Sequence, residues 1–328
     1  MSGKKVTFPP VPKPLHDLHW PSIRWYAWVH LMGALGVWYL YKPFDVVLPA
    51  GSIAHEFLRT YFGDTIIISR YSHWALAISV ALFFLVHLSI GALAHRYYSH
   101  RSYVASARMQ YMLLPFFAAA AQGPMLYWAL IHVDHHADTD GPGDRHSPYR
   151  SGNGFVGRIA GFFYSQMGWP CTNHGKREPR MEVLKAFMRN KDAYVPAKWE
   201  KDNHKKLAFR IGFVLPIALC SLVGDPVTGM TVGWGLRLVC NYHGTWIVNS
   251  IAHTIGKVTK PGQTARNAWW WLQIPLGIAS IGEANNHAEH HDDTNRWILG
   301  WFDPAGWFIW CWMQIRLASE NEPKTATA

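Results

Sequence analysis

One long apolar run, at positions 74–94, constrains how this chain can fold more than any other feature of the sequence. Only Ser79, His87 and Ser89 interrupt the run. About 20 apolar residues are enough for a helix to cross a bilayer. Three further stretches are candidates for the same role, at positions 25–41, 207–223 and 230–252. Together these four segments predict an all-α membrane protein with four transmembrane helices.

The last of these segments carries polar side chains that a lipid-facing helix would not tolerate. Arg237, Asn241, His243 and Asn249 all lie within 230–252. Because polar groups at membrane depth are costly, we expect these side chains to face the interior of the protein.

Basic residues are distributed unevenly between the predicted loops, which orients the helices in the membrane. The segment 96–206 contains 16 Lys and Arg residues, whereas the loop 42–73 contains three and the short loop 224–229 contains none. Because cytosolic loops collect Lys and Arg, we expect both termini and the segment 96–206 to be cytosolic. The net charge of +10 then reflects topology and lipid head groups, and no nucleic-acid partner is expected.

The composition agrees with a multi-pass integral membrane protein, either of the endoplasmic reticulum or of a bacterial inner membrane. Charged residues make up only 16% of the chain, which argues against an ordinary soluble enzyme. The proline-rich segment 1–24 lacks the features of a signal peptide and is interpreted as a cytosolic arm. We expect a single membrane domain over 25–318 and a polar tail over 319–328.

Histidine is the second unusual feature, because nine of the 19 histidines fall at the predicted cytosolic ends of the spans or beyond them. They form three clusters and one outlier: His95 and His100; His132, His135 and His136; His287, His290 and His291; and His253. Two of the clusters repeat the pattern H-x-x-H-H. A single histidine is usually an ordinary residue, but this repetition on one side of a membrane favours metal binding.

The spacing within the clusters predicts two neighbouring metal ions. On a helix, His132 shares a face with His135 and His136, and these two adjacent residues point about 100° apart. His95 and His100 are five residues apart, so we expect them at a helix end and not on one helical face. Nine imidazoles are too many ligands for one ion, and imidazole suits Fe, Zn, Cu and Ni.

Acidic neighbours can orient metal-binding imidazoles by accepting their second N–H. The candidates are Asp134, Asp138, Asp140, Asp144, Glu283, Glu289, Asp292 and Asp293. The remaining histidines are interpreted as solvated, core or interface residues: His16, His19, His30, His55, His73, His87, His174, His204 and His243. His146 stands apart in a D-x-H element at 144–146.

In this order of motifs the chain resembles the membrane fatty acid desaturases of the stearoyl-CoA (Δ9) type. The motifs are HRYYSHR at 95–101, HVDHH at 132–136, LRLVCNYHGTWIVNSIAH at 236–253 and GEANNHAEHH at 282–291. The part from Thr245 to His253 is the most specific, because membrane hydroxylases share the histidine boxes more loosely. The chain departs from the family at Leu130 and Ile131, which precede the second box, and this leaves the acyl carrier open.

The resemblance implies four transmembrane helices under a cytosolic helical dome that holds a histidine-rich site for two iron ions, Fe²⁺. The family's ligand positions match His95, His100, His132, His135, His136, His253, His287, His290 and His291, and Asn249 matches a position that holds a metal through water. The family's substrate tunnel matches Gln122, Trp128, Thr245 and Trp246. No catalytic residue is expected beyond the metal ligands.

The implied activity is an O2-dependent fatty acyl desaturase that introduces a cis double bond at the Δ9 position of an acyl-CoA or acyl-lipid. Two electrons must come from outside, because the chain has no flavin or nicotinamide fingerprint. The implied donor is cytochrome b5 or a ferredoxin with its reductase, and membrane lipids are the other partners. If the protein is a different enzyme, the alternative is a related di-iron hydroxylase or ketolase. If it is not an enzyme, the alternative is a metal transporter or a haem-carrying membrane protein.

Overall fold

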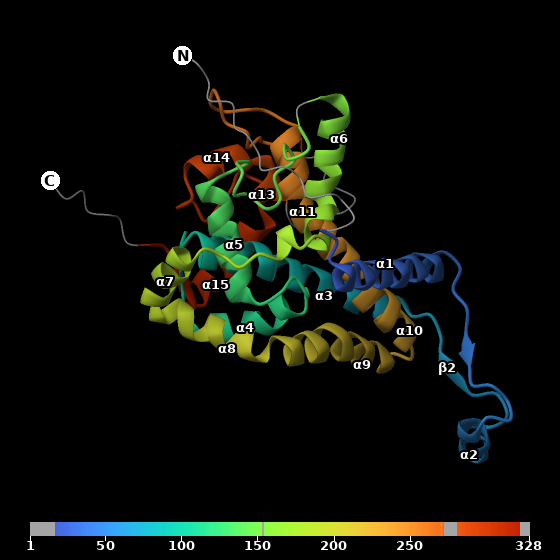
Figure 1. Ribbon diagram of the computed structural model, residues 1–328. Coiled ribbons are helices and arrows are strands. Elements are labelled where there is room, and N and C mark those ends of the chain that lie inside the picture. Colours follow the sequence, from blue (N-terminus) through green and yellow to red (C-terminus); the bar gives the residue numbers. More distant parts are fainter. Residues whose placement is uncertain (1–16, 153, 270, 272–280, 322–328) are drawn as a thin grey trace.

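The computed structural model describes residues 17–152, 154–269, 271 and 281–321, and most of them are helical (Figure 1). Most of the predicted arm and tail, at 1–16 and 322–328, lies outside the described residues, as does His16. Within this part of the chain the strands form two short antiparallel pairs. They are β1 (Val46–Val47) with β2 (Ile67–Ser69), and β3 (Val104–Ala105) with β4 (Ala318–Ser319).

Four long helical stretches cover the predicted spans; they come together on one side of the molecule, and two of them, through Lys191–Leu207 and Arg237–Thr254, extend along the other side (Figure 1). They are α1 (Trp20–Tyr41); α3 (His73–Leu88) with η1 (Ser89–Ser99); α8 (Lys191–Leu207) with η5 (Ala208–Val214) and α9 (Leu215–Ser221); and α10 (Pro226–Met230) with η6 (Thr231–Leu236) and α11 (Arg237–Thr254). Among the described residues, one continuous helix, His73–Ser99, is long and apolar enough to cross a membrane by length and composition. Membrane crossing by the other three remains a prediction.

Glycines allow α1 and η6 to pack closely. A Cβ atom on Gly36 would lie 2.7 Å from the carbonyl oxygen of Thr231, and one on Gly235 would lie 2.8 Å from Cβ of Met32. Small residues at such contacts let helix backbones approach without a clash, as in membrane helix pairs. The polar residues of α11 follow the expectation for an inward-facing helix, because Arg237 and Asn241 are buried.

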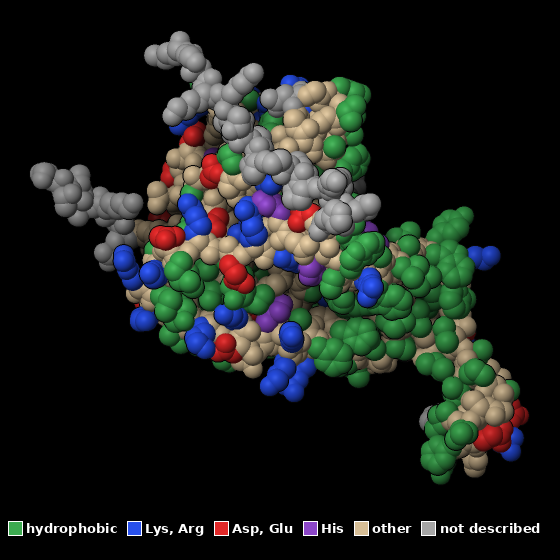
Figure 2. Space-filling model, in the orientation of Figure 1, with side chains coloured by type: hydrophobic (Ala, Val, Ile, Leu, Met, Phe, Trp, Pro, Cys, Tyr) green, Lys and Arg blue, Asp and Glu red, His purple; other side chains and the backbone are tan. Residues whose placement is uncertain are grey.

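The outward side of these helices is apolar. Trp28, Leu31, Leu35 and Trp38 on α1 are each between 39% and 53% exposed. Figure 2 shows hydrophobic side chains covering this region, whereas Lys and Arg gather over the other half of the molecule. A continuous apolar surface of this kind fits contact with lipid, in agreement with the predicted topology.

The other half of the molecule is built from shorter helices around a core of Leu113, Leu114, Phe117, Met125 and Leu130. These elements are α4 (Ala107–Ala118), α5 (Met125–Ala137), α6 (Phe155–Phe163), η2 (Tyr164–Gly168), η3 (Trp169–Cys171), η4 (His174–Lys176), α7 (Met181–Arg189), α13 (Ile281–Asn285), α14 (His287–Asp292) and α15 (Pro304–Gln314). At the opposite end, β1, β2 and α2 (Ile53–Phe62) form a projection (Figure 1).

Asp225 links α10 to the end of β2 and to the segment that precedes α3, near the projection. Its carboxylate is buried and accepts hydrogen bonds from the Ser69 hydroxyl at 2.9 Å, the Ser72 amide at 2.9 Å, and the amide and hydroxyl of Thr228 at 3.0 and 2.6 Å. The carboxylate thus caps α10 and also binds the segment that leads into α3.

Replacing Asp225 with alanine should lower the free energy of unfolding by about 3 kcal/mol, because several buried donors lose their acceptor at once. Asp225→Asn is the matched control and should lose less, since its side-chain carbonyl still caps α10. Thermal unfolding of the purified protein in detergent measures the effect. Equal unfolding temperatures for the alanine variant and the unsubstituted protein would contradict this role.

Candidate metal centre

The structure brings all nine predicted histidines together from four separate parts of the chain. They come from the end of η1, from α5, from the end of α11 and from α14. His95 and His100 lie at the end of η1, as expected, but the expectation that they do not share a face was wrong, because their ring centroids are 4.8 Å apart. The cause is that η1 is a π-helix, in which the His100 amide donates to the His95 carbonyl at 3.2 Å and residues five apart become neighbours.

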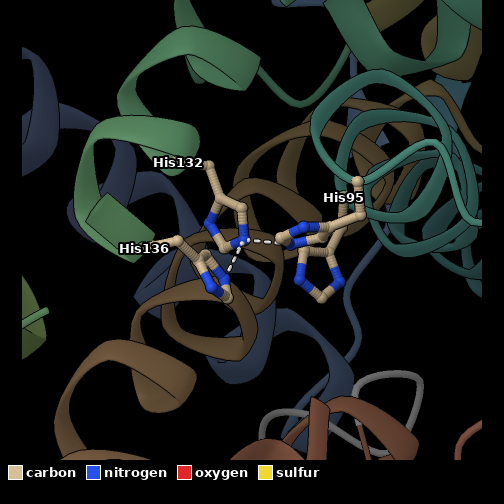
Figure 3. Close-up of side chains that lie close together, drawn as sticks. His95, His132 and His136 are labelled. Carbon is tan, nitrogen blue, oxygen red and sulfur yellow. Dashed lines mark hydrogen bonds between the residues drawn. The ribbon is translucent and has the colours of Figure 1, made fainter. Parts of the chain in front are cut away.

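The first group, called site A, contains His95, His100, His132 and His136, whose ligand atoms all lie within 4.8 Å of one another. Nε2 of His132 lies 2.8 Å from Nε2 of His100 and 3.1 Å from Nε2 of His136. Figure 3 shows how His132 and His136 from one helix approach His95 from another. His290 adjoins this group, with its ring 4.8 Å from that of His95 and 4.7 Å from that of His100.

The second group, called site B, contains His135, His253, His287 and His291. Nε2 of His287 lies 2.8 Å from Nε2 of His253 and 3.1 Å from Nε2 of His291. The two sites are direct neighbours, because the rings of His136 and His291 stack at 4.0 Å. The adjacent residues His135 and His136 therefore point to different groups, as their helical spacing predicts.

The donor set of both sites fits a bound metal ion. Nε2 of His95 and both ring nitrogens of His290 are buried without a hydrogen-bond partner. Buried polar atoms nearly always have a hydrogen-bond partner or a ligand, and the protein supplies none for these nitrogens. Burial lowers the pKa of His132 and His290 well below 6.5, and their histidine neighbours lower it further, so both rings are neutral and available as ligands.

Three carboxylates orient three of these rings. Nδ1 of His135 lies 2.7 Å from Asp144, Nδ1 of His253 lies 2.7 Å from Asp140, and Nδ1 of His95 lies 2.7 Å from Glu283. His135 and His253 can donate Nδ1–H to their carboxylates, which turns the lone pair of Nε2 toward the site, whereas Glu283 lies at ion-pair distance from His95. The other acidic candidates serve elsewhere: Asp134 pairs with Arg180, Glu289 with Arg296 and Asp292 with Lys260, while Asp138 and Asp293 accept from loop amides.

A buried arginine supports site A, and the sequence analysis did not identify it. The Arg96 side chain is fully buried; it donates to Glu283 at 2.9 Å and grips both carboxylate oxygens of Asp303 at 2.7 Å. Burial raises the pKa of Glu283, but the charges of Arg96 and His95 outweigh this effect and lower it to about 2. The position of Arg96 next to His95, at the end of an apolar run, was the available signal.

His146 is the one further histidine, among the described residues, that joins such a group. Its ring is buried, lies 4.5 Å from the ring of His135 and places Nδ1 3.4 Å from Asp144. Burial lowers the pKa of His146 to about 3, so the ring is neutral at physiological pH. The sequence analysis quoted this residue within a motif but gave it no role.

A cavity of about 230 Å³ adjoins site A. Its walls include all four predicted tunnel residues together with His132 and Asn249. The Trp128 indole donates to Gln122 at 3.1 Å, the Gln122 amide donates to the Thr245 hydroxyl at 2.9 Å, and Trp128 stacks on His132 at 5.4 Å. The cavity wall and site A are therefore in direct contact. Asn249 lies at the wall, outside both histidine groups, and its water-mediated ligand role remains a prediction.

Replacing Asp140 with asparagine should lower the metal affinity of site B by about 10- to 100-fold. The amide NH2 would face Nδ1 of His253 and favour the tautomer that carries its proton on Nε2. The backbone should tolerate the change, because Asp140 has a φ of 58° and asparagine accepts this left-handed conformation. Titration of the metal-free protein with Fe²⁺ measures the effect. Asp202→Asn, at the exposed ion pair with Lys198, is the control, and equal affinities in both variants would contradict the role of Asp140.

Comparison with known proteins agrees with this geometry. The fatty acid desaturase family model matches residues 71–296. The Delta-9 desaturase-like 5 protein of Arabidopsis thaliana is 31% identical over 244 residues, which cover 73% of this chain and 74% of that protein. A probable acyl-CoA desaturase of Schizosaccharomyces pombe is 28% identical over 317 residues, covering 92% of this chain and 56% of that protein.

A third relative, the hex-5-enoyl-[acyl-carrier protein] acetylenase of Moorena producens, is 28% identical over 267 residues, covering 77% of this chain and 75% of that protein. The names of these relatives share chemistry on acyl chains but differ in the carrier. The chain belongs to the fatty acid desaturase family, whose members are membrane-associated oxidoreductases that act on fatty acyl chains with O2.

Proposed function

We propose that this protein is an O2-dependent di-iron desaturase that introduces a cis double bond at the Δ9 position of a saturated fatty acyl chain. The observation that carries the proposal is the pair of converging imidazole groups beside a cavity lined by Gln122, Trp128 and Thr245. Removal of hydrogen from unactivated methylenes is beyond any side-chain acid or base; O2 is the oxidant, and irons held by these residues would activate it, with two electrons from the substrate and two from an external donor reducing it to water.

In this proposal site A and site B each hold one iron ion. The ligands of site A are His95, His100, His132, His136 and His290; those of site B are His135, His253, His287 and His291, with Asn249 acting through water. The carboxylates that accept from His135 and His253 hold those rings in the tautomer that a metal needs. Arg96 and Asp303 fix Glu283 and so keep His95 in place.

The residues of the cavity seat one carbon–carbon bond beside the metal sites. Gln122 is held between Trp128 and Thr245, which makes this part of the wall rigid. Because Trp128 also stacks on His132, a shift of the wall would disturb site A. Regioselectivity then follows from the distance between the carrier at the cavity mouth and the metal sites.

The electrons reach the centre from a separate protein in this proposal, cytochrome b5 or a ferredoxin with its reductase. The proposed topology has four transmembrane helices and a cytosolic dome that contains both sites, so that a soluble donor can approach. Three observations support this topology: the apolar surface of α1, the apolar helix His73–Ser99 and the basic residues of 96–206.

Expression in a host that lacks its own desaturase tests the proposal. The expected product is a monounsaturated fatty acid, lighter than the saturated substrate by two hydrogens, with its double bond located by chemical cleavage. A product heavier by one oxygen would favour the alternative, a related di-iron hydroxylase or ketolase. A folded, iron-loaded protein that forms no alkene with a competent electron donor would refute the desaturase assignment.

A further inference from the structure

Three cavities follow one another from the metal centre to the apolar surface. The cavity beside site A shares Tyr26, Gln122, Gly123 and Lys176 with a second cavity of about 390 Å³. The second cavity shares Trp25 and Ala121 with a third, of about 400 Å³. The loop between α4 and α5 lines all three, so the cavities lie in a row and only shared side chains separate them; this row is called the path.

The third cavity, called the lateral groove, lies between α1, η5 and α11 and is lined by aromatic rings. Phe209 stacks on Phe213 at 5.7 Å, Phe213 meets Trp234 at 5.1 Å, and Trp234 meets Trp25 at 6.4 Å. Its floor includes the buried Leu238, whereas Phe209 is 58% exposed. The groove therefore opens toward the same apolar surface that fits contact with lipid (Figure 2).

Basic residues stand at the rim of the path. Lys205 and His204 line the lateral groove where α8 leads into η5, and Lys176 lines the second cavity. His204 is fixed by the buried Glu200, with Nδ1 2.6 Å from the carboxylate. An apolar groove with a cationic rim suits a molecule with an acyl chain and an anionic head group.

We propose that the lateral groove is the entrance for an acyl chain of an anionic membrane phospholipid, which passes Trp25 and reaches the metal centre from the side of the membrane. The aromatic lining of the groove, which reaches the apolar surface at Phe209, favours a membrane lipid over a soluble carrier, and Lys205 at the rim favours an anionic head group. The inference rests on the proposed function for what happens at the end of the path, but lipid entry itself needs neither iron nor turnover.

Trp25 forms the wall between the lateral groove and the second cavity. Its indole N–H donates to the Tyr242 hydroxyl at 2.9 Å, and this hydroxyl donates to the Ala121 carbonyl at 3.1 Å. The two bonds hold the ring against the α4–α5 loop. The position of Trp25 therefore sets the width of the passage.

Photo-cross-linking of the full-length protein in vesicles of phosphatidylcholine and phosphatidylglycerol tests the inference. The probe is a phosphatidylglycerol with a diazirine at the methyl end of one acyl chain. We expect cross-links to peptides that contain Phe209 and Trp25, and deeper ones to the peptide that contains Gln122. Ala208→Trp fills the lateral groove and should reduce the deep cross-links about tenfold.

Val214→Trp is the matched control, because Val214 is exposed on the same helical stretch but does not line the groove. Lys205→Glu should reduce cross-linking of phosphatidylglycerol about fivefold and leave that of a phosphatidylcholine probe unchanged. Unchanged deep cross-links in Ala208→Trp, or their displacement by excess acyl-CoA, would overturn the inference. Cross-linking is independent of turnover, so failure to form an alkene would refute the desaturase assignment and not the entrance.

Discussion

Replacing His290 with alanine should abolish desaturation and remove about half of the bound iron, since one of two sites loses a ligand. His290 is buried and both its ring nitrogens lack a hydrogen-bond partner, so the nitrogen that carries the lone pair is available to a metal ion. His135→Ala should have the same effect on activity through site B, where the ring is held by Asp144. Iron per protein, measured by mass spectrometry of the metal, and the fatty acid profile of expressing cells give the two readouts.

His73→Gln is the control for these variants, because His73 is exposed at the start of α3, outside both histidine groups. It should retain full iron content and activity. The alanine variants must remain folded, which their elution from size-exclusion chromatography shows. Full activity in either alanine variant would remove that histidine from the set of ligands.

The apolar runs and the helical repeat were enough to predict the four long helical stretches. They also predicted that the second histidine cluster, His132, His135 and His136, is shared between two metal sites. The pattern H-x-x-H-H places His135 and His136 on different sides of α5, and the structure assigns them to different groups. The pairing of His95 with His100 could not be predicted in this way, because it depends on a π-helix over Ser89–Ser99. A π-helix replaces the ordinary hydrogen-bond pattern and is fixed by tertiary packing, which a helical repeat does not reveal.

Long-range contacts explain the other limits of the sequence analysis. Eight carboxylates were candidates for orienting the rings, and only the folded chain selects three of them. Glu283 contacts His95 although the two residues are far apart in the sequence, and Arg96 joins the same carboxylate to Asp303. These residues carry no local spacing signal, since the contacts depend on how α15 packs against η1 and α13 packs against α15. The lateral groove could not be predicted for the same reason, because it forms only where α1, η5 and α11 pack together.

The metal-free protein should lose stability steeply as the pH falls from about 6.5 to 5. Burial lowers the pKa of six cluster histidines well below 6.5, and neighbouring histidines lower it further. The six are His100, His132, His136, His287, His290 and His291. Below pH 6.5 the unfolded chain binds protons at these residues and the folded chain does not, so acid favours unfolding.

Each such histidine contributes a slope of up to about 1.4 kcal/mol per pH unit, and six together make the folded state acid-labile. Bound iron should oppose the loss down to lower pH, because it binds the neutral rings and stabilises the folded state. Thermal unfolding of metal-free and iron-loaded protein across this pH range measures both effects. His135 does not add to the slope, because Asp144 and Asp140 raise its pKa against the effect of burial. A flat stability profile for the metal-free protein would mean that the rings are hydrated and not enclosed, and a buried, preformed pair of sites could then no longer be maintained.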